Sequence, residues 1–143
     1  ITSFPQVWGS FVWNMFDFSV PARDEGDTPG LNDKGLITYD RKVRKDAFYF
    51  YKANLNQNPM IHITSKRFKE RSDPKTPVKV YCNRSGVELL VNDVTYRQMS
   101  NFGMNVYRLE FVNLKQGKNV IVARSTCEKG VISDECQWVL KKK

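Results

Sequence analysis

The side chains best suited to chemistry gather in one irregular stretch, from Ser19 to about Asn32, where carboxylates alternate with glycines and prolines. Asp24, Glu25 and Asp27 are the acidic members of this loop. Such carboxylates either accept hydrogen bonds from the hydroxyl groups of a ligand or hold the loop in shape by binding its own donors. We predict the second role. A loop of this length without regular structure is usually kept for function.

The only histidine, His62, offers no metal site. It alternates with Ile61 and Ile63, so on a strand its side chain points away from theirs. No second residue of a metal-binding type lies near it in the sequence, and we expect a surface or hydrogen-bonded histidine without chemistry. We predict no metal and no cofactor.

The three cysteines, Cys82, Cys127 and Cys136, form no CxxC pattern. Cys127 and Cys136 flank a segment that turns back at Gly130, so a cross-strand disulfide there fits an oxidising compartment. Small buried thiols fit the sequence equally well. The sequence leaves the pairing open.

The net charge of +8 is concentrated in a proline-containing connector, residues 66–79, and in the lysine tail at 141–143. We interpret it as solvated connector and tail charge and predict no nucleic-acid partner. No apolar run approaches the length of a membrane-spanning helix, so no membrane partner is predicted. The balance of 41% hydrophobic and 27% charged residues is that of a globular domain.

The acidic loop is framed by a predicted β/α unit. Residues 11–18, "FVWNMFDF", are apolar on both alternations except at Asn14 and Asp17, which is typical of a strand covered on both faces. "GLITYD" follows the loop as a short extended piece. After a predicted N-cap at Asp40, Val43, Ala47, Phe50, Tyr51 and Asn54 recur at helical spacing.

Beyond Asn58-Pro59 the pattern changes from helical to alternating, which places a domain boundary between 1–58 and 59–143. The second part contains seven short alternating segments separated by turn residues: "MIHITSK", "VKVYC", "VELLV", "VTYRQ", "NVYRLEFVNL", "NVIVARS" and "CQWVLK". This pattern predicts an Ig-like antiparallel β-sandwich. Tyr107, Leu109, Phe111 and Trp138 are expected in or near its core.

Four stretches, in the order "WGSFVWNMFDF", "RDEGDTPG", "NDKGL" and "DAFYFYKAN", resemble the end of the catalytic barrel of family 2 glycoside hydrolases. The similarity is greatest to bacterial β-galactosidases of the kind found in gut Bacteroides. It implies a mainly β chain in which strand, loop and helix 8 of a (β/α)8 barrel precede an Ig-like domain. It also implies that the barrel's remainder is a partner, that a β-galactoside is the substrate, and that the location is periplasmic or secreted.

The resemblance implies roles for three residues. Trp13 matches the tryptophan that lies against the sugar in the innermost subsite. Asn32 and Lys34 match an Asn-x-Lys motif that grips the uronate carboxylate in related β-glucuronidases. Because the longer match favours a galactosidase, we expect Asn32 and Lys34 at the rim of the site, with their ligand undecided.

Both catalytic glutamates of the family lie on earlier barrel strands, and none of the acids of this loop takes their role. The expectation is therefore a C-terminal piece of a retaining β-galactosidase that is inactive alone. Two alternatives stay open: a β-glucuronidase parent enzyme, and a non-catalytic Ig-like module that binds a carbohydrate or a protein.

Overall fold

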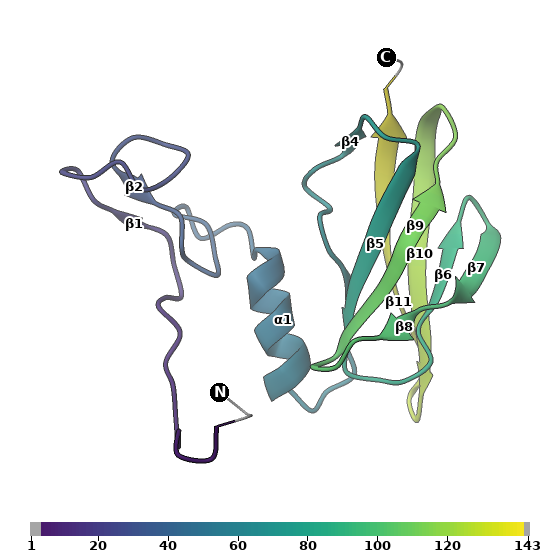
Figure 1. Cartoon of the computed structure of the whole chain (residues 1–143), viewed down its shortest axis with the longest axis horizontal. Coiled ribbons are helices and arrows are strands. Elements are labelled where there is room, and N and C mark those ends of the chain that lie inside the picture. Colours follow the sequence, from purple (N-terminus) through teal and green to yellow (C-terminus); the bar gives the residue numbers. More distant parts are fainter. Residues whose placement is uncertain (1–3, 142–143) are drawn as a thin grey trace. The chain divides into compact units, whose positions relative to one another are not determined.

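The computed structural model describes residues 4–141 (Figure 1). Its elements are β1 (Phe18–Ser19), β2 (Leu31–Asn32), α1 (Asp46–Leu55), β3 (Ile61–Ile63), β4 (Glu70–Arg71), β5 (Lys75–Cys82), β6 (Glu88–Val91), β7 (Val94–Gln98), β8 (Ser100–Asn101), β9 (Val106–Asn113), β10 (Gly117–Cys127) and β11 (Gly130–Leu140). The chain divides into two compact units, one ending at Phe48 and the other beginning at Tyr49. The division lies inside α1, whereas the sequence predicted it after the helix.

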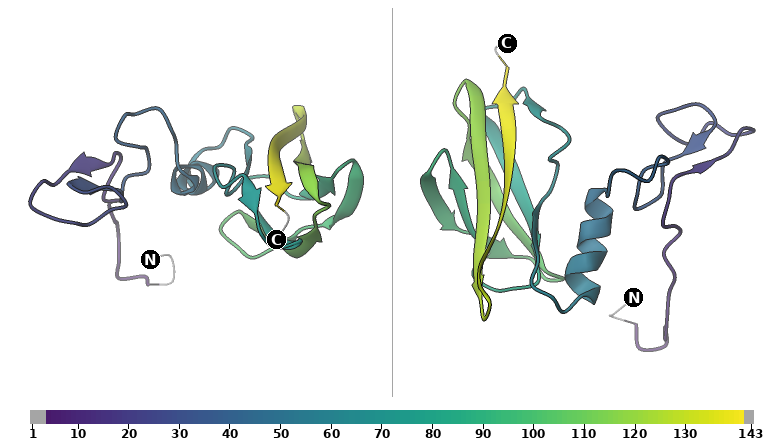
Figure 2. Two further views of the ribbon diagram at one scale, coloured as in Figure 1. Left: turned by 90° about the horizontal axis from the view of Figure 1, so that it is seen from above. Right: turned by 180° about the vertical axis from the view of Figure 1, so that it is seen from behind.

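The second unit is an Ig-like sandwich of two sheets (Figure 2). One sheet has the order β4-β11-β10-β6-β7 and the other the order β3-β5-β9-β8. All pairs are antiparallel except the short parallel pair of β4 with β11. The seven predicted strands are all present, and the mainly β fold class is confirmed.

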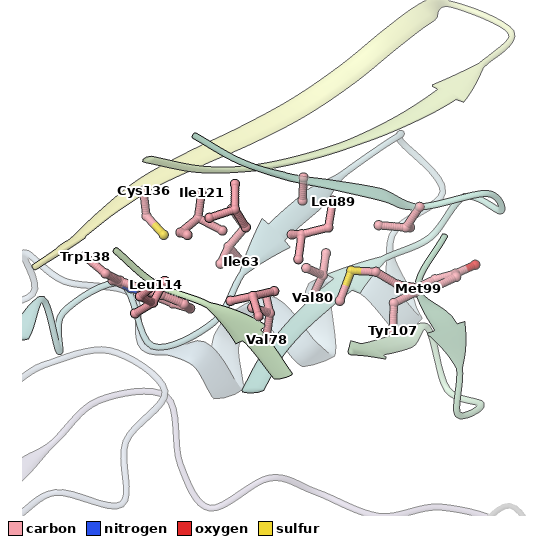
Figure 3. Packing of buried hydrophobic residues seen from close by; sticks show 14 of the residues in the cluster. Ile63, Val78, Val80, Leu89, Met99, Tyr107, Leu114, Ile121, Cys136 and Trp138 are labelled. Atoms are coloured by element: carbon pink, nitrogen blue, oxygen red, sulfur yellow. The ribbon is translucent and has the colours of Figure 1, made fainter. Parts of the chain in front are cut away.

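The core lies between the two sheets (Figure 3). Side chains of β10 and β11, among them Ile121 and Cys136, point toward Val78 and Val80 of β5. The predicted core residues Trp138 and Tyr107 are buried, at 1% and 5% exposure. Leu109 is partly buried against this cluster. Strict alternation along β10 and β11 therefore gives each strand one face in the core.

Phe111 was also expected in or near the core, and this prediction is wrong, because its side chain is 52% exposed. The pairing of β5 with β9 shifts between Thr76 and Val78, where β9 carries one extra residue. An extra residue reverses which face the following side chains occupy. Val112 therefore enters the core, and Phe111 points outward with the Lys75 ammonium 5.5 Å from its ring centroid.

The helix begins later than predicted. Asp40 accepts bonds from the Thr38 hydroxyl at 2.6 Å and the Lys42 backbone N–H at 3.1 Å, so it closes a turn and caps no helix. Arg41 has a positive φ of 65°, which a right-handed helix excludes. α1 starts only at Asp46, and the predicted apolar-face residue Ala47 is exposed.

From Tyr49 onward the helix belongs to the sandwich. Ala53 is buried with Met60 and Tyr81, and the ring centroids of Phe50 and Tyr81 lie 5.5 Å apart. His62, which was expected at the surface or hydrogen-bonded, is 7% exposed and stacks on Tyr49 with ring centroids 3.6 Å apart. Its Nδ1 lies 3.8 Å from the carboxylate of Asp134 on β11.

The cysteines are free thiols. Cys136 lies opposite Ile121 in mid-strand, while Cys127 lies opposite Gly130 at the hairpin end, so their register keeps the two sulfurs apart. Burial raises the pKa of Cys136 to about 12 and raises that of Cys82. These two thiols therefore stay protonated and behave as small core residues.

The basic connector is not free of structure. Lys66 pairs with Asp134, and the guanidinium of Arg71 lies 3.9 Å from the Trp138 ring centroid. Of the predicted tail charge, Lys141 pairs with Glu70 at 2.7 Å, while the last two lysines lie outside the described residues. Within the described part of the chain, no helix is long and apolar enough to cross a membrane.

Asn119 on β10 is a fully buried amide with all its bonding capacity used. Its Oδ1 accepts from Lys115 N–H and from Asn92 Nδ2, both at 2.9 Å, and its Nδ2 donates to the carbonyls of Lys115 and Gly117 at 2.8 and 3.0 Å. We expect Asn119→Ala to lower the free energy of unfolding by about 2–3 kcal/mol, because the four hydrogen bonds of a buried amide are lost together. Urea denaturation measures this.

Asn113→Ala is the matched control for Asn119→Ala, since Asn113 is an exposed asparagine at the end of β9. Its unfolding midpoint should stay close to that of the wild type. Equal destabilisation by the two variants would show that the Asn119 network contributes nothing specific.

Candidate functional site

The candidate site is the loop between β1 and β2, in the first unit. Phe18 pairs with Asn32 and Ser19 with Leu31, and the Val20 N–H donates to the Gly30 carbonyl at 2.7 Å. This short antiparallel neck brings the two ends of the loop together. Residues 20–30 therefore form a closed loop with a fixed base.

The strand expected over 11–18 is not formed as predicted. Only its end is paired: the Leu36 and Ile37 N–H groups donate to the carbonyls of Asn14 and Met15 at 3.0 and 2.9 Å, and Phe16 makes an isolated parallel bridge to Ile37. Within residues 4–141, the earlier part finds no strand to pair with, and a strand without neighbours is not stable in water. Phe11 is therefore fully exposed.

A buried ion pair holds the base of the loop, and we call Asp17, Gly35 and Lys45 the loop clamp. Asp17, 7% exposed, accepts through Oδ1 from the Gly35 N–H at 2.9 Å and from Lys45 Nζ at 2.6 Å. Lys45 Nζ also donates to the Asp33 carbonyl at 2.6 Å. The clamp thus joins the residue before the neck to two segments that follow it.

Gly35 leaves no room for a side chain. A Cβ at this position would lie 2.1 Å from the backbone nitrogen of Asp17 and 2.7 Å from its Oδ1. Such a close backbone approach is possible only for glycine.

Glu25 is the centre of the polar contacts inside the loop. Its Oε2 accepts from Asn32 Nδ2 at 2.5 Å and lies 3.7 Å from Lys34 Nζ, while its Oε1 accepts from Arg23 at 3.1 Å. Asn32 is 1% exposed, and its Oδ1 accepts from the Lys34 backbone N–H at 3.0 Å. The amide is therefore fixed from both sides.

These contacts keep the Glu25 carboxylate charged. The hydrogen bond from Asn32, and then that from Arg23, hold the pKa of Glu25 below its usual range. Glu25 is thus an anion at neutral pH, and it is bound by the two residues that the sequence singled out.

Trp13 stands apart from these contacts. It is 74% exposed, and its ring meets that of Phe18 edge to face with centroids 6.2 Å apart. Phe18 is the strand partner of Asn32, so Trp13 belongs to the same unit as the Asn32 and Lys34 pair without touching it. Its indole is open to a ligand.

Chemically, the loop offers an anion-binding pair and an open aromatic face. The Asn32 amide and the Lys34 ammonium converge on one carboxylate oxygen, the geometry that charge-assisted recognition of a carboxylate requires. Among the described residues no group of three His, Cys, Asp or Glu side chains is placed to hold a metal ion.

The predicted loop-ordering role holds for Glu25, while Asp24 and Asp27 are exposed. The contribution of Asp17 and Lys45 was missed. The available signal was Asp17 itself, a carboxylate in an otherwise apolar run, because a buried charge needs a partner.

Comparison with known proteins shows that this chain is similar to part of larger glycosidases. It is 49% identical over 118 residues to a β-glucuronidase of Bacteroides fragilis, covering 82% of this chain and 17% of that protein. A second relative, from Formosa agariphila and named provisionally as a β-glucuronidase, is 36% identical over 139 residues, with 89% of this chain and 16% of its own length covered. The chain thus spans about one sixth of the curated relatives it matches. No family model matches it.

Solved structures give the same result. An FMN-binding β-glucuronidase from Faecalibacterium prausnitzii matches with a TM-score of 0.86 and 38% identity, over 97% of this chain and 20% of that one. A Bacteroides fragilis protein provisionally named a β-galactosidase matches with a TM-score of 0.84 and 36% identity, over 92% of this chain and 20% of the other. The relatives are therefore glycosidases of both names.

Proposed function

We propose that this chain is part of a retaining family 2 glycoside hydrolase, in which it supplies the last β/α unit of the catalytic barrel and the Ig-like domain that follows. In this proposal the two catalytic glutamates lie on earlier barrel strands, before residue 1. The loop between β1 and β2 forms one rim of the sugar site.

The exposed apolar residues of the first unit support a barrel origin. Trp8 and Phe11 are exposed at 98% and 101%, and Trp13 at 74%. Aromatic side chains of this size are seldom left in water in such a row. Neighbouring barrel strands would pair with the backbone of residues 11–15 and cover those side chains that do not face the sugar.

We propose a β-glucuronide as the substrate. The observation that carries this choice is the convergence of Asn32 Nδ2 and Lys34 Nζ on one carboxylate oxygen, at 2.5 and 3.7 Å. The pair is thus preorganised for a carboxylate, which a glucuronide has at C6 and a galactoside lacks. In this arrangement Trp13 would lie against the sugar ring.

A neutral β-galactoside is the second candidate, and it is the substrate that the sequence resemblance favoured. The specific observation for it is the 36% identical Bacteroides fragilis structure that carries the β-galactosidase name. In that case Asn32 and Lys34 would serve the loop alone, through Glu25.

Steady-state kinetics of the longer enzyme decide between the two. We expect kcat/KM for an aryl β-glucuronide to exceed that for the matching aryl β-galactoside by on the order of a hundredfold or more, because only the glucuronide offers a carboxylate to Asn32 and Lys34. The purified 143-residue chain should turn over neither substrate, since it lacks both glutamates of the proposed mechanism. Preference for the galactoside, or turnover by the isolated chain, would contradict the proposal.

A further inference from the structure

Glu25 occupies the site in which the proposed substrate carboxylate would bind. Its Oε2 accepts a hydrogen bond from the Asn32 amide and lies 3.7 Å from the Lys34 ammonium, and these are the two groups assigned to the substrate. A substrate carboxylate cannot use these donors at the same time as Glu25, because two carboxylates bound to the same groups would repel each other. Binding of a uronic acid therefore requires Glu25 to leave.

We propose that Glu25 is an internal stand-in for the substrate carboxylate: it holds Asn32 and Lys34 in the empty enzyme, and a uronic acid binds by displacing it. This inference rests on the proposed function. Glu25 is then a residue that determines specificity, and it need not touch the reacting atoms.

The contacts around Glu25 suit such an exchange. Asn32 is fixed, since it is buried and its Oδ1 is bound by the Lys34 backbone N–H. Glu25 is movable, since its side chain is 29% exposed and its Oε1 already binds Arg23, which is 68% exposed. After displacement Glu25 can keep the Arg23 partner, so no charge is left without a counterion.

The exchange also discriminates between sugars. A substrate carboxylate makes the same charge-assisted bonds as Glu25 and can replace it. A neutral C6 hydroxyl makes weaker bonds and leaves Glu25 in place. Glu25 therefore excludes neutral sugars from Asn32 and Lys34. It also lowers the affinity for the uronic acid, because it competes for the same two groups.

Glu25→Gln tests the inference in the longer enzyme, with aryl β-glucuronide and aryl β-glucoside, which differ at C6 alone. The amide keeps the shape and an acceptor for Asn32 but loses the charge. We expect KM for the glucuronide to fall by on the order of five- to tenfold, because the competitor is weaker. KM for the glucoside should change less than about twofold.

Asp27→Asn is the matched control, because it removes one exposed negative charge from the same loop without removing a contact to Asn32 or Lys34. It should leave both KM values nearly unchanged. An equal effect of the two variants would reduce the role of Glu25 to general loop charge and overturn the inference. So would a Glu25→Gln variant with a raised or unchanged KM for the glucuronide.

A structure of the wild-type enzyme with D-glucuronate gives an independent readout. We expect the ligand carboxylate on Asn32 Nδ2 and Lys34 Nζ, with Glu25 paired to Arg23. A bound glucuronate with Glu25 still on Asn32 would overturn the inference while leaving the proposed function intact. A wild-type enzyme that prefers neutral glycosides would instead contradict the proposed substrate, and the inference with it.

Discussion

Replacing Lys34 by alanine in the longer enzyme is expected to lower kcat/KM for an aryl β-glucuronide roughly tenfold to hundredfold. A charge-assisted hydrogen bond of about 1.5–3 kcal/mol is lost, and the ammonium has no substitute on the carboxylate. The Asn32 amide, the other group proposed to bind the substrate carboxylate, is neutral. Steady-state kinetics with paired aryl glucuronide and aryl galactoside substrates measure the effect.

Lys42→Ala is the control for charge, because Lys42 is an exposed lysine of the same unit whose ammonium forms a 3.9 Å ion pair with the Asp40 carboxylate. Lys42→Ala should leave kcat/KM nearly unchanged for both substrates. If the substrate is a neutral galactoside, Lys34→Ala instead removes a loop contact. The loss in kcat/KM is then smaller than tenfold and is similar for both substrates. A strong galactosidase activity that is insensitive to Lys34→Ala would contradict the glucuronide proposal.

The largest effect on stability is expected from Trp138→Ala. Trp138 is 1% exposed in the core of the sandwich, and its ring also carries the Arg71 guanidinium at 3.9 Å. Its Nε1 has no acceptor among the described residues, so packing and the Arg71 contact hold the side chain. We expect a loss of about 3–5 kcal/mol in the free energy of unfolding, measured by urea denaturation.

Phe111→Ala is the matched aromatic truncation, since Phe111 is on the neighbouring sheet but 52% exposed. Its cost should stay near or below about 1 kcal/mol. Similar destabilisation by the two variants would contradict the assignment of Trp138 to the core and of Phe111 to the outside.

Phe111 also shows which property of a sheet cannot be predicted from local sequence, namely the register of one strand against its neighbour. The seven sandwich strands were predictable because alternation and turn residues are local signals: Asn92 and Asp93, both with positive φ, turn the chain between β6 and β7. The extra residue in β9 is a property of its pairing with β5 and has no local signature. The alternation therefore gave the correct face for Tyr107 and the wrong one for Phe111.

In the N-terminal unit, the local pattern predicts a strand that the described chain does not form in full. "FVWNMFDF" carries the pattern of a strand, but a strand needs partners, and the described chain supplies one only near Ile37. The late start of α1 follows from a turn at Asp40 and Arg41 that competes with a capped helix. In both places local preference was overruled by what the chain can pair with.

In the candidate site, resemblance pointed to Asn32 and Lys34, and composition pointed to the acidic loop. Neither predicted that Glu25 binds that pair, because the contact joins residues seven positions apart through a loop conformation that only the folded chain defines. The same holds for Asp17 and Lys45, which lie 28 positions apart.

The loop clamp has a consequence for how the sequence of this loop can evolve. Asp17, Gly35 and Lys45 fix the two ends of the loop with a buried ion pair and a close backbone approach, and neither involves residues 20–30. Changes at exposed positions of the interval, such as Asp24 and Asp27, therefore leave the clamp contacts untouched, while a change at Gly35 does not. The exposed part of the loop can therefore diverge in sequence while the three clamp residues are inherited unchanged.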